Sequence, residues 1–434
     1  MQEIISKTKE NVSVVCPIST DDKKLMSASS RLAEAKGLAL AIKLNIVHEE
    51  TIKLKNIKSA TYFSKGFIEK IKPILELNEI SLMVVDTSLS PIQQRNLEKE
   101  LNVKVIDRTA LILEIFGERA NTSEGKLQVE LAHLTYQRSR LVRSWTHLER
   151  QRGGAGFLGG PGEKQIELDR RIIDDKIVKI KKELEKVKNT RHLQRGNRKK
   201  VPYPIVALVG YTNAGKSTLF NKLSGCSVLA EDMLFATLDP TLRKIKLPSG
   251  RDVIFSDTVG FISDLPHELI MAFRSTLEEV LEADIIVHIR DIANPDTALQ
   301  KKDVLDVLES LGLKDIDTQN NYIEVLNKTD LLNEEDKNIL LQKLANRTQN
   351  IISLSALTGQ GCNNLLNLID EKLSQDYKTY NIKVNPADGK LQSWLYKNSE
   401  VISKNIEDEK LIFNIKINEA NAQRLKKLFL IPLN

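Results

Sequence analysis

Hydrophobic and polar positions alternate along the first 120 residues in the pattern of a small α/β domain. Short apolar runs (VSVVCPI, SLMVVD and VKVID) are separated by stretches with helical spacing, such as RLAEAKGLALAIKL and PIQQRNLEKEL. This alternation is typical of strands and helices that build a partly parallel sheet. We therefore predict an N-terminal α/β domain over residues 1–120, and its sequence contains no evident catalytic cluster.

From Lys126 the apolar positions follow steps of four and three residues, the spacing of helices that wind about each other. Two such runs flank QRGGAGFLGGPGE, whose six glycines and one proline break helices. The simplest prediction is an antiparallel helical hairpin with a glycine-rich tip, over residues 121–199. The alternative is two helices that pack on the neighbouring domain and are joined by an idle loop. The seam positions are Leu127, Leu131, Leu134, Arg138, Leu141, Trp145 and Leu148, then Ile166, Arg170, Ile173, Ile177, Ile180, Leu184 and Val187.

The rest of the chain predicts two further domains. Residues 200–374 alternate strands and helices with the regularity of a doubly wound sheet. Residues 375–434 contain LIFNIKI beside NAQRLKKLF, which indicates a small α+β domain without chemistry of its own. The expected fold class is thus a multidomain α/β protein.

Composition narrows the cellular setting. No run of 18 uncharged apolar residues occurs, so we expect no membrane span. The start, MQEIISKTKENVSVV, mixes charged residues into the apolar positions, unlike a secretory signal. Cys16, Cys226 and Cys362 lie far apart, which favours buried, reduced thiols in a cytoplasmic protein.

Positive charge is concentrated in one arm. The chain has a net charge of +6, but residues 163–200 alone hold 14 Lys or Arg against 7 Asp or Glu, a net of +7. Such a focused basic segment favours a polyanion, and the scarcity of aromatic residues favours structured RNA over stacked single strands. The alternative is a solvated charged face. The candidate RNA-binding residues are Arg152, Gly153, Gly154, Gly160, Gly162, Arg191, Arg195, Arg198, Lys199 and Lys200.

A phosphate-binding motif lies between an apolar run and a helical pattern. GYTNAGKST fits the pattern G-x-x-x-x-G-K-[ST] with Gly210, Gly215, Lys216 and Ser217. Glycines let backbone N–H groups converge on a β-phosphate, while the lysine reaches the β- and γ-oxygens and the serine hydroxyl binds Mg²⁺. The alternative is a glycine turn that merely begins a helix.

A second acidic element follows about forty residues later. In DVIFSDTVGF an apolar strand ends in Asp257, and Gly260 stands three residues further on. A carboxylate at this place can hold Mg²⁺ through water, and the Gly260 N–H can meet a γ-phosphate. Together with the phosphate-binding motif, the DxxG pattern predicts a nucleoside triphosphatase.

The base is predicted from YIEVLNKTD. Guanine presents two adjacent N–H donors that the carboxylate of Asp330 can accept, whereas adenine presents none and would leave that carboxylate unpaired. Asn327 would stabilise the loop and reach the purine edge, and the stem of Lys328 would cover the ring. A backbone N–H of Ser355-Ala356 can donate to guanine O6. These elements in this order predict GTP rather than ATP, and so argue against a P-loop kinase or ATPase.

These motifs resemble those of translation-factor-like GTPases, and one branch is especially similar. LSPIQQRNLEKEL, VIDRTALILEIF, GKLQVELAHLTYQ, GPGEKQIELDRR, GYTNAGKSTLFN, FATLDPT and DTVGFI look like stretches of the HflX family. The resemblance implies an N-terminal domain with a hairpin, a GTPase domain and a small C-terminal domain. It also implies binding to the large ribosomal subunit, with the tip reaching toward the peptidyl-transferase region, and splitting of stalled ribosomes under stress.

The resemblance further identifies Thr237 as the threonine that binds Mg²⁺ only when the γ-phosphate is present. Two stretches depart from the family pattern: the tip GGAGFLGGPGE is one residue longer and has Leu158 and Gly159 where relatives carry an arginine, and YFSKGF lacks two glycines. The expected protein is monomeric.

Hydrolysis is expected to be slow without a partner. Phe261 stands directly after DTVG, where many small GTPases carry a glutamine that orients water, and a phenyl ring can neither donate nor accept. The alternative is that Phe261 is a core residue that begins the next helix. Two functions remain open: a GTP-hydrolysing ribosome factor, and an RNA-binding assembly or silencing factor whose nucleotide site is mainly regulatory.

The expected catalytic residues are Lys216, Thr237 and Gly260, and the expected metal ligands are Ser217, Thr237 and, through water, Asp257. The expected nucleotide-binding residues are Gly210, Tyr211, Thr212, Asn213, Ala214, Gly215, Lys216, Ser217, Thr218, Phe235, Ala236, Thr237, Leu238, Asp239, Asp257, Thr258, Val259, Gly260, Asn327, Lys328, Thr329, Asp330, Ser355, Ala356 and Leu357.

Overall fold

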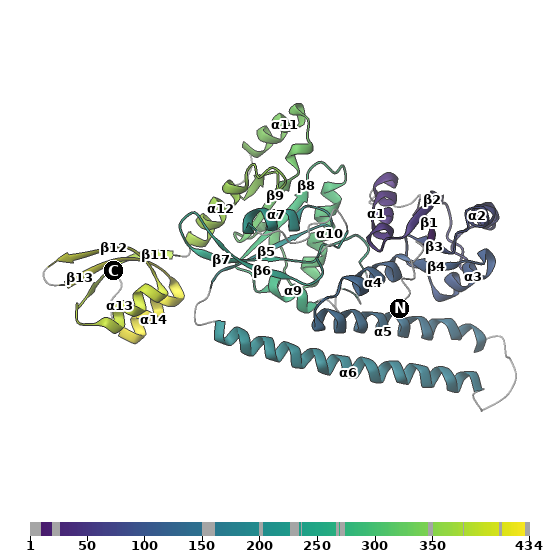
Figure 1. The fold of residues 1–434 in the computed structure, drawn as a ribbon, viewed down its shortest axis with the longest axis horizontal. Coiled ribbons are helices and arrows are strands. Elements are labelled where there is room, and N and C mark those ends of the chain that lie inside the picture. Colours follow the sequence, from purple (N-terminus) through teal and green to yellow (C-terminus); the bar gives the residue numbers. More distant parts are fainter. Residues whose placement is uncertain are drawn as a thin grey trace, which may run out of the picture.

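Within the part of the chain that the structure describes, the strands form three separate sheets, of four, six and three strands (Figure 1). The computed structural model describes residues 10–19, 27–149, 161–198, 203–225, 234–235, 237–265, 269, 274–345, 350–375, 377–407 and 410–429. Within these residues, no helix is long and apolar enough to cross a membrane.

The N-terminal sheet has the order β2-β1-β3-β4. All of its strand pairs are parallel, so the sheet is fully parallel, whereas a partly parallel sheet was predicted. A side chain caps the first turn of each helix around the sheet; in α3, Ser90 and Gln93 form a reciprocal capping box. The elements are β1 (Asn11–Ser19), α1 (Ala28–Ala41), β2 (Asn45–Leu54), α2 (Lys65–Leu77), β3 (Leu82–Val85), α3 (Pro91–Leu101), β4 (Lys104–Asp107) and α4 (Arg108–Arg119).

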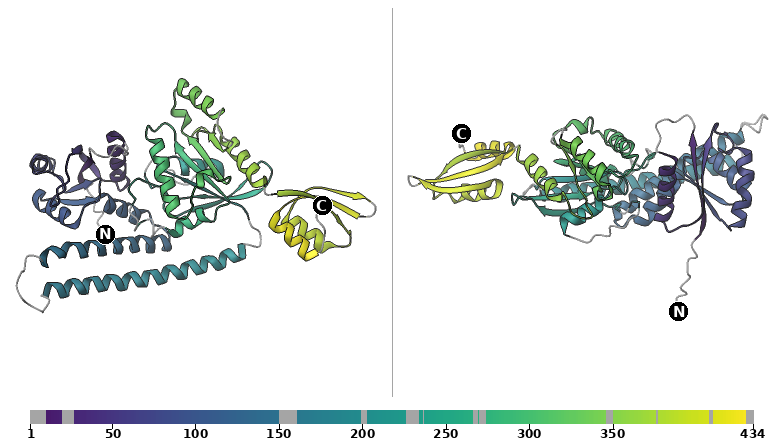
Figure 2. Two further views of the ribbon diagram at one scale, coloured as in Figure 1. Left: turned by 180° about the vertical axis from the view of Figure 1, so that it is seen from behind. Right: turned by 90° about the horizontal axis from the view of Figure 1, so that it is seen from above.

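Two long helices, α5 (Ser123–Glu149) and α6 (Pro161–Arg198), run antiparallel along one side of the molecule (Figures 1 and 2). Their seam uses the predicted positions: Leu134, Ile177 and Ile180 are buried together, with Leu127, Leu131, Ile173 and Leu184 packed against them. Further along the seam, Arg138 pairs with Asp174 at 3.0 Å. The predicted hairpin is therefore confirmed.

Two details of the hairpin differ from the prediction. Helix α6 begins at Pro161, so Pro161 and Gly162 belong to the helix rather than to the tip, because proline is tolerated in a first helical turn. Helix α5 also packs on the N-terminal sheet domain: Tyr136 Oη donates to Asp107 Oδ1 (2.8 Å), and Arg140 Nη1 pairs with Asp107 Oδ2 (3.1 Å). Helix α5 is thus part of the hairpin and also packs on the neighbouring domain, which the alternative expected of both helices.

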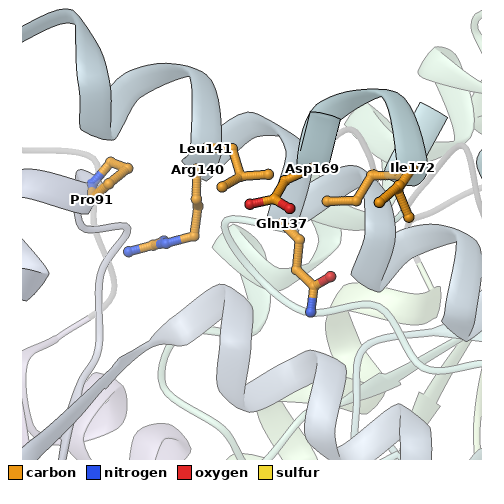
Figure 3. Close-up of a pocket in the computed structure, with 7 residues that line it drawn as sticks. Pro91, Gln137, Arg140, Leu141, Asp169 and Ile172 are labelled. Carbon is orange, nitrogen blue, oxygen red and sulfur yellow. The ribbon is translucent and has the colours of Figure 1, made fainter. Parts of the chain in front are cut away.

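A shallow cavity of about 500 Å³ lies where the hairpin meets α3 (Figure 3). Its lining residues come from α3, α5 and α6, and none of them belongs to the predicted nucleotide site. They are Pro91, Gln137, Arg140, Leu141, Asp169, Ile172 and Ile173.

The central sheet has the order β10-β9-β8-β5-β7-β6 and is parallel except for β6. Alternate residues of β5 face opposite cores: Val206 and Leu208 join the cluster of α7 and α12, whereas Ala207 and Val209 join that of α9 and α10. This two-sided packing confirms the doubly wound α/β sheet. The elements are β5 (Ile205–Gly210), α7 (Lys216–Ser224), β6 (Thr241–Lys246), β7 (Asp252–Asp257), α9 (Arg274–Leu281), β8 (Ile285–Asp291), α10 (Thr297–Ser310), η1 (Ile316–Thr318), β9 (Tyr322–Asn327), η2 (Thr329–Leu331), α11 (Glu334–Ala345), β10 (Ile351–Ser353) and α12 (Cys362–Gln375).

One hydrophobic core is shared between the N-terminal domain and the central sheet. It contains Leu38 of α1 and Phe116 of α4 together with Phe235 and Leu238, which precede β6. The rings of Phe116 and Phe235 meet edge to face with centroids 4.7 Å apart. The loop before β6 is therefore anchored in the N-terminal domain.

The C-terminal sheet has a core of its own, in which Ile382, Leu395, Phe413 and Leu425 are buried. Its antiparallel order β11-β13-β12 carries two helices, which agrees with the predicted α+β domain (Figure 1). The elements are β11 (Tyr377–Val384), α13 (Gly389–Asn398), β12 (Glu400–Glu407), β13 (Lys410–Asn418) and α14 (Glu419–Phe429). The domain boundaries at 120, 199 and 374 stay predictions.

Candidate nucleotide-binding site

The phosphate-binding motif forms the turn between β5 and α7, as its sequence predicts. A Cβ atom on Gly210 would lie 2.2 Å from the carbonyl oxygen of Ile289, so the strand ends against its neighbour where only glycine fits. Gly215 has φ +92°, and a Cβ there would lie 2.3 Å from Asn327 Nδ2. Both glycines are therefore required by close approach.

Lys216 is buried within this turn. Its Nζ donates to the carbonyl oxygens of Gly210 (3.1 Å) and Tyr211 (2.8 Å). Burial lowers the pKa of Lys216 to about 8, because desolvation outweighs the attraction of Asp257. The ammonium group is therefore held at the turn with few compensating charges, which suits it to receive an anion.

Three oxygen atoms from separate segments meet beside Lys216. Asp257 Oδ2 accepts hydrogen bonds from Ser217 Oγ (2.7 Å) and Thr237 Oγ1 (3.0 Å), and the two hydroxyl oxygens are 2.9 Å apart. Asp257 Oδ1 is buried and has no hydrogen-bond partner among the residues that the structure describes. Burial raises the pKa of Asp257 against the lowering effects of Lys216 and the two hydroxyls. The residues predicted as metal ligands are thus brought together.

Gly260 lies against the phosphate-binding turn. A Cβ atom at this position would lie 2.9 Å from Thr212 Cγ2 and 3.1 Å from Lys216 Nζ. The next residue, Phe261, donates its N–H to the Gly210 carbonyl (3.1 Å) and accepts from the Thr212 N–H (2.7 Å).

The side chain of Phe261 is only 2% exposed, in the shared core. Phe261 is therefore a core residue, as the alternative held. It does not begin a helix, because it forms a β-bridge with Tyr211.

The predicted base loop is linked to the phosphate-binding turn by Asn327. Its Nδ2 donates to the Ala214 carbonyl (2.8 Å), and its Oδ1 accepts from the Ala356 N–H (2.9 Å). Asp330 Oδ1 accepts from Ser355 Oγ (2.5 Å). The Ala356 N–H, a candidate donor to guanine O6, is thus engaged by Asn327 in this arrangement.

Lys328 extends from the same loop and pairs with Asp291 at 2.8 Å. That bond ties the base loop to the end of β8, beside the strand that carries the phosphate-binding turn.

The remaining residues predicted to contact nucleotide differ in their surroundings. Thr258 and Val259 are buried, and Thr258 Oγ1 donates to the Leu208 carbonyl (2.6 Å). Asp239 is bound by residues before α5 rather than by the Ser217–Thr237–Asp257 cluster. Asn213 and Leu357 lie on turns, Thr218 lies in α7 and Thr329 in η2, and all four are partly or fully exposed. Phe235 and Leu238 lie in the core, and Ala236 lies outside the described residues.

A buried ionic cluster, which the motifs did not indicate, borders the phosphate-binding turn. Tyr211 Oη donates to Glu34 of α1 and accepts from the Ser263 N–H (2.9 Å). Arg108 pairs with Glu34 and Asp86 and donates to the Ser263 carbonyl (3.0 Å).

The pKa of Arg108 reflects its burial beside two carboxylates. Burial alone would lower the pKa of Arg108, but Asp86 and Glu34 raise it above its ordinary value. The N-terminal domain therefore contacts the segment after DTVG directly. No local spacing in the sequence could have indicated these residues, since Glu34, Arg108 and Ser263 are brought together only by the tertiary fold.

Only part of the predicted RNA-binding set lies within the described residues. Gly162, Arg191, Arg195 and Arg198 belong to α6, whereas their side chains are not described. Arg152, Gly153, Gly154, Gly160, Lys199 and Lys200 lie outside the described residues.

A doubly wound sheet that presents a phosphate-binding turn, an adjacent Ser–Thr–Asp cluster and an Asn-Lys-x-Asp loop defines a P-loop GTPase. Comparison with protein-family models agrees. Four models match in succession: GTP-binding GTPase N-terminal (residues 29–117), GTP-binding GTPase middle region (119–198), 50S ribosome-binding GTPase (205–328) and HflX C-terminal domain (340–430).

Curated relatives identify the branch. The chain is 50% identical over 366 residues to GTPase HflX of Magnetococcus marinus, covering 84% of this chain and 82% of the relative. GTPase HflX of Escherichia coli is 44% identical over 336 residues, 77% of each chain, and that of Caldanaerobacter subterraneus is 40% identical over 428 residues, 99% and 96% of the two chains. The chain therefore belongs to the HflX family, and it is a GTP-binding, GTP-hydrolysing protein. The structure of SsGBP with GDP aligns with a TM-score of 0.48 and 24% identity, over 84% of this chain and 99% of that one.

Proposed function

We propose that this GTPase binds the large ribosomal subunit in its GTP form and separates stalled ribosomes under stress, in the cytoplasm and as a monomer. The observation that carries the proposal is the match of residues 205–328 to a model described as a 50S ribosome-binding GTPase. The same chain holds a net charge of +7 over residues 163–200, a basic segment that includes most of α6 and supplies the attraction that a polyanionic partner requires.

Guanine selection is proposed to depend on Asp330. Its carboxylate would accept the two adjacent N–H groups of guanine, while the bond from Ser355 fixes its orientation. Asn327 would hold the turn and the base loop in register through its bonds to Ala214 and Ala356.

The donor set fits Mg²⁺. Octahedral Mg²⁺ with bonds of about 2.0–2.1 Å places neighbouring ligand oxygens about 2.9 Å apart. The oxygens of Ser217 and Thr237 are 2.9 Å apart, and the buried Asp257 Oδ1, which has no hydrogen-bond partner among the described residues, could accept from a metal-bound water. We propose that Ser217 and Thr237 bind Mg²⁺ directly and Asp257 through water. When bound, the ion supplies neutralisation of the phosphate charge.

The residues of the turn would then stabilise the leaving group. Lys216 exchanges its two carbonyl partners for phosphate oxygens, and the Gly260 N–H meets the γ-phosphate. Phe261 stays in the core, so no side chain at that position orients the attacking water. Hydrolysis is therefore slow alone and is accelerated when a partner positions the water.

Co-sedimentation with purified ribosomal subunits tests the proposal. Binding to the large subunit should require a GTP analogue, be weaker with GDP, and be accompanied by stimulated GTP hydrolysis. Incubation with intact ribosomes should yield free subunits by light scattering. Binding without subunit release would favour the assembly or silencing role, and no nucleotide-dependent binding would refute both.

A charge variant tests the basic arm. Neutralising Arg195, Arg198, Lys199 and Lys200 together should weaken binding and flatten its salt dependence. A matched variant that neutralises four exposed lysines of the N-terminal sheet domain should leave the slope closer to that of the original protein. These lysines are Lys55, Lys72, Lys99 and Lys104.

A further inference from the structure

We infer that the start of hairpin helix α5 is a positioning element for binding of the triphosphate form of the nucleotide. It anchors switch I, which we define as residues 234–240, and thereby holds Thr237 at the metal-binding cluster. The inference rests on the proposed role of Thr237, and it assigns to Asp239 a contact with the hairpin instead of a contact with nucleotide.

Asp239 forms three hydrogen bonds with the residues that precede α5. Its Oδ2 accepts from the backbone N–H groups of Asn121 and Thr122, each at 3.0 Å, and its Oδ1 accepts from Thr122 Oγ1 at 2.5 Å. Thr122 Oγ1 in turn accepts from the Gly125 N–H at 2.9 Å, within the first turn of α5. The carboxylate thus completes the helix cap from a distant part of the chain.

This location suits a carboxylate for two reasons. The first N–H groups of a helix have no partner within it, and they give the helix N-terminus a partial positive charge. Asp239 Oδ2 accepts from the Thr122 N–H, directly before the first residue of α5, and from the Asn121 N–H one residue earlier, so one carboxylate oxygen satisfies two backbone donors at the helix start. The start of α5 therefore attracts Asp239 specifically as an anion and as a double acceptor.

Gly125 leaves room for the Asp239 carboxylate to lie against the first turn of α5. A Cβ atom on this residue would lie 2.6 Å from Asp239 Oδ1, closer than side-chain atoms can approach. Because three hydrogen bonds hold the carboxylate, it could move aside only by giving them up. An alanine at this helical position would otherwise favour the helix, so Gly125 offers a way to break the contact from the hairpin side.

The anchored residues lie on both sides of Thr237. Phe235 and Leu238 are 3% and 2% exposed in the shared core, and Asp239 is fixed to α5. Thr237 itself is only partly buried and is held by its bonds to Asp257 and Ser217. With its neighbours fixed, Thr237 loses little further conformational freedom when it binds the cluster. The hairpin helix therefore favours the triphosphate-bound arrangement of switch I.

The coupling must act in both directions. If the contact between Asp239 and α5 strengthens binding of GTP, then binding of GTP strengthens that contact by the same factor. The start of the helix that leads to the glycine-rich tip thus responds to the nucleotide.

The test compares affinities for a non-hydrolysable GTP analogue and for GDP, with Mg²⁺ present. Asp239→Ala and Gly125→Ala should each reduce affinity for the analogue by roughly 5- to 10-fold, the lower range of coupling between sites. Affinity for GDP should change less than about 2-fold, since Thr237 is proposed to bind only with the γ-phosphate. Retained GDP binding also shows that each variant is folded.

Two further variants separate the possible outcomes. Ser90→Ala removes the cap of α3, in which the Ser90 side chain accepts from the Gln93 N–H within the N-terminal domain, and should leave the ratio of the two affinities unchanged. Thr237→Ala tests the proposed role of Thr237 and should lower analogue affinity at least as much as Asp239→Ala.

If Thr237→Ala lowers analogue affinity and the Asp239 and Gly125 variants do not, the inference is wrong while the role of Thr237 stands. If Thr237→Ala leaves the preference unchanged, that role fails and the inference with it. Equal losses for the analogue and GDP in the Asp239 variant would indicate a merely structural contact and overturn the inference.

Discussion

Arg108→Met tests the buried ionic cluster that joins the N-terminal domain to the phosphate-binding turn. The Arg108 side chain is 3% exposed, and it pairs with Glu34 and Asp86, whose side chains are 7% and 1% exposed. Methionine keeps much of the volume of arginine but removes the charge and the donors. Two buried carboxylates then lose their main partner.

The expected loss of folding free energy depends on which partners Asp86 and Glu34 keep in the variant. Removing one partner of a buried ion pair costs about 3–5 kcal/mol. Asp86 keeps a weaker pair with Arg31 at 3.4 Å, and Glu34 keeps the hydrogen bond from Tyr211, so the lower end is expected. For a cooperative unit of 150–250 residues, about 3 kcal/mol lowers the Tm by about 6–12 °C.

Thermal unfolding followed by circular dichroism, with and without GDP, measures this change. Arg138→Met is the matched control, because the pair between Arg138 and Asp174 is 43% and 42% exposed and should contribute at most about 1 kcal/mol. The double variant Arg108→Met with Glu34→Gln should lose less than the sum of the single variants, because one stranded charge is then removed.

The same variant should also disturb the segment after DTVG, because Arg108 donates to the Ser263 carbonyl. The rate of GTP turnover should fall even at temperatures at which the variant is still folded. If Arg108→Met lowers the Tm no more than Arg138→Met and leaves turnover unchanged, the cluster is not the connection described above.

Three other predictions concern the nucleotide site itself. The pKa of Lys216 is lowered from 10.5 to about 8, so between these values the folded protein holds fewer protons than the unfolded chain, and the stability of the nucleotide-free protein should rise with pH across this window. A triphosphate raises that pKa again, so calorimetry in two buffers near about pH 9 should detect proton uptake on GTP binding, and its absence would contradict the buried, uncompensated ammonium. Asp330→Asn should shift preference from guanine toward xanthine nucleotides, measured by competition; unchanged GTP affinity would remove Asp330 from the base site. Gly210→Ala should abolish nucleotide binding or prevent folding, because its Cβ would lie 2.2 Å from a backbone oxygen, and a normal melting curve with normal GTP affinity would refute that reading.

Elements with a local signal were predictable from the sequence. The phosphate-binding turn has a fixed order of glycines, lysine and serine, and the hairpin seam repeats over many residues, so Leu134, Ile177 and Ile180 could be expected to meet. In both cases the physical constraint acts within one element or between two neighbouring elements.

Contacts that depend on tertiary packing gave no such signal. The bond network of Glu34, Arg108 and Ser263 joins three segments far apart in the chain. Asp239 was expected to contact nucleotide because it stands in FATLDPT, yet its carboxylate is bound by the residues before α5. The sequence shows that position 239 is an aspartate, but it does not show which helix N-terminus the fold places beside it.

The core that Leu38 and Phe116 share with Phe235 and Leu238 affects how this protein can be dissected. Excising residues 200–374 would expose the hydrophobic surface of this shared core to solvent. The loop that carries Thr237 would then lose its packing contacts with the N-terminal domain. Rates measured on such a fragment would describe a damaged enzyme. By contrast, the C-terminal sheet has a separate core and is the part that can be trimmed with the least disturbance to catalysis.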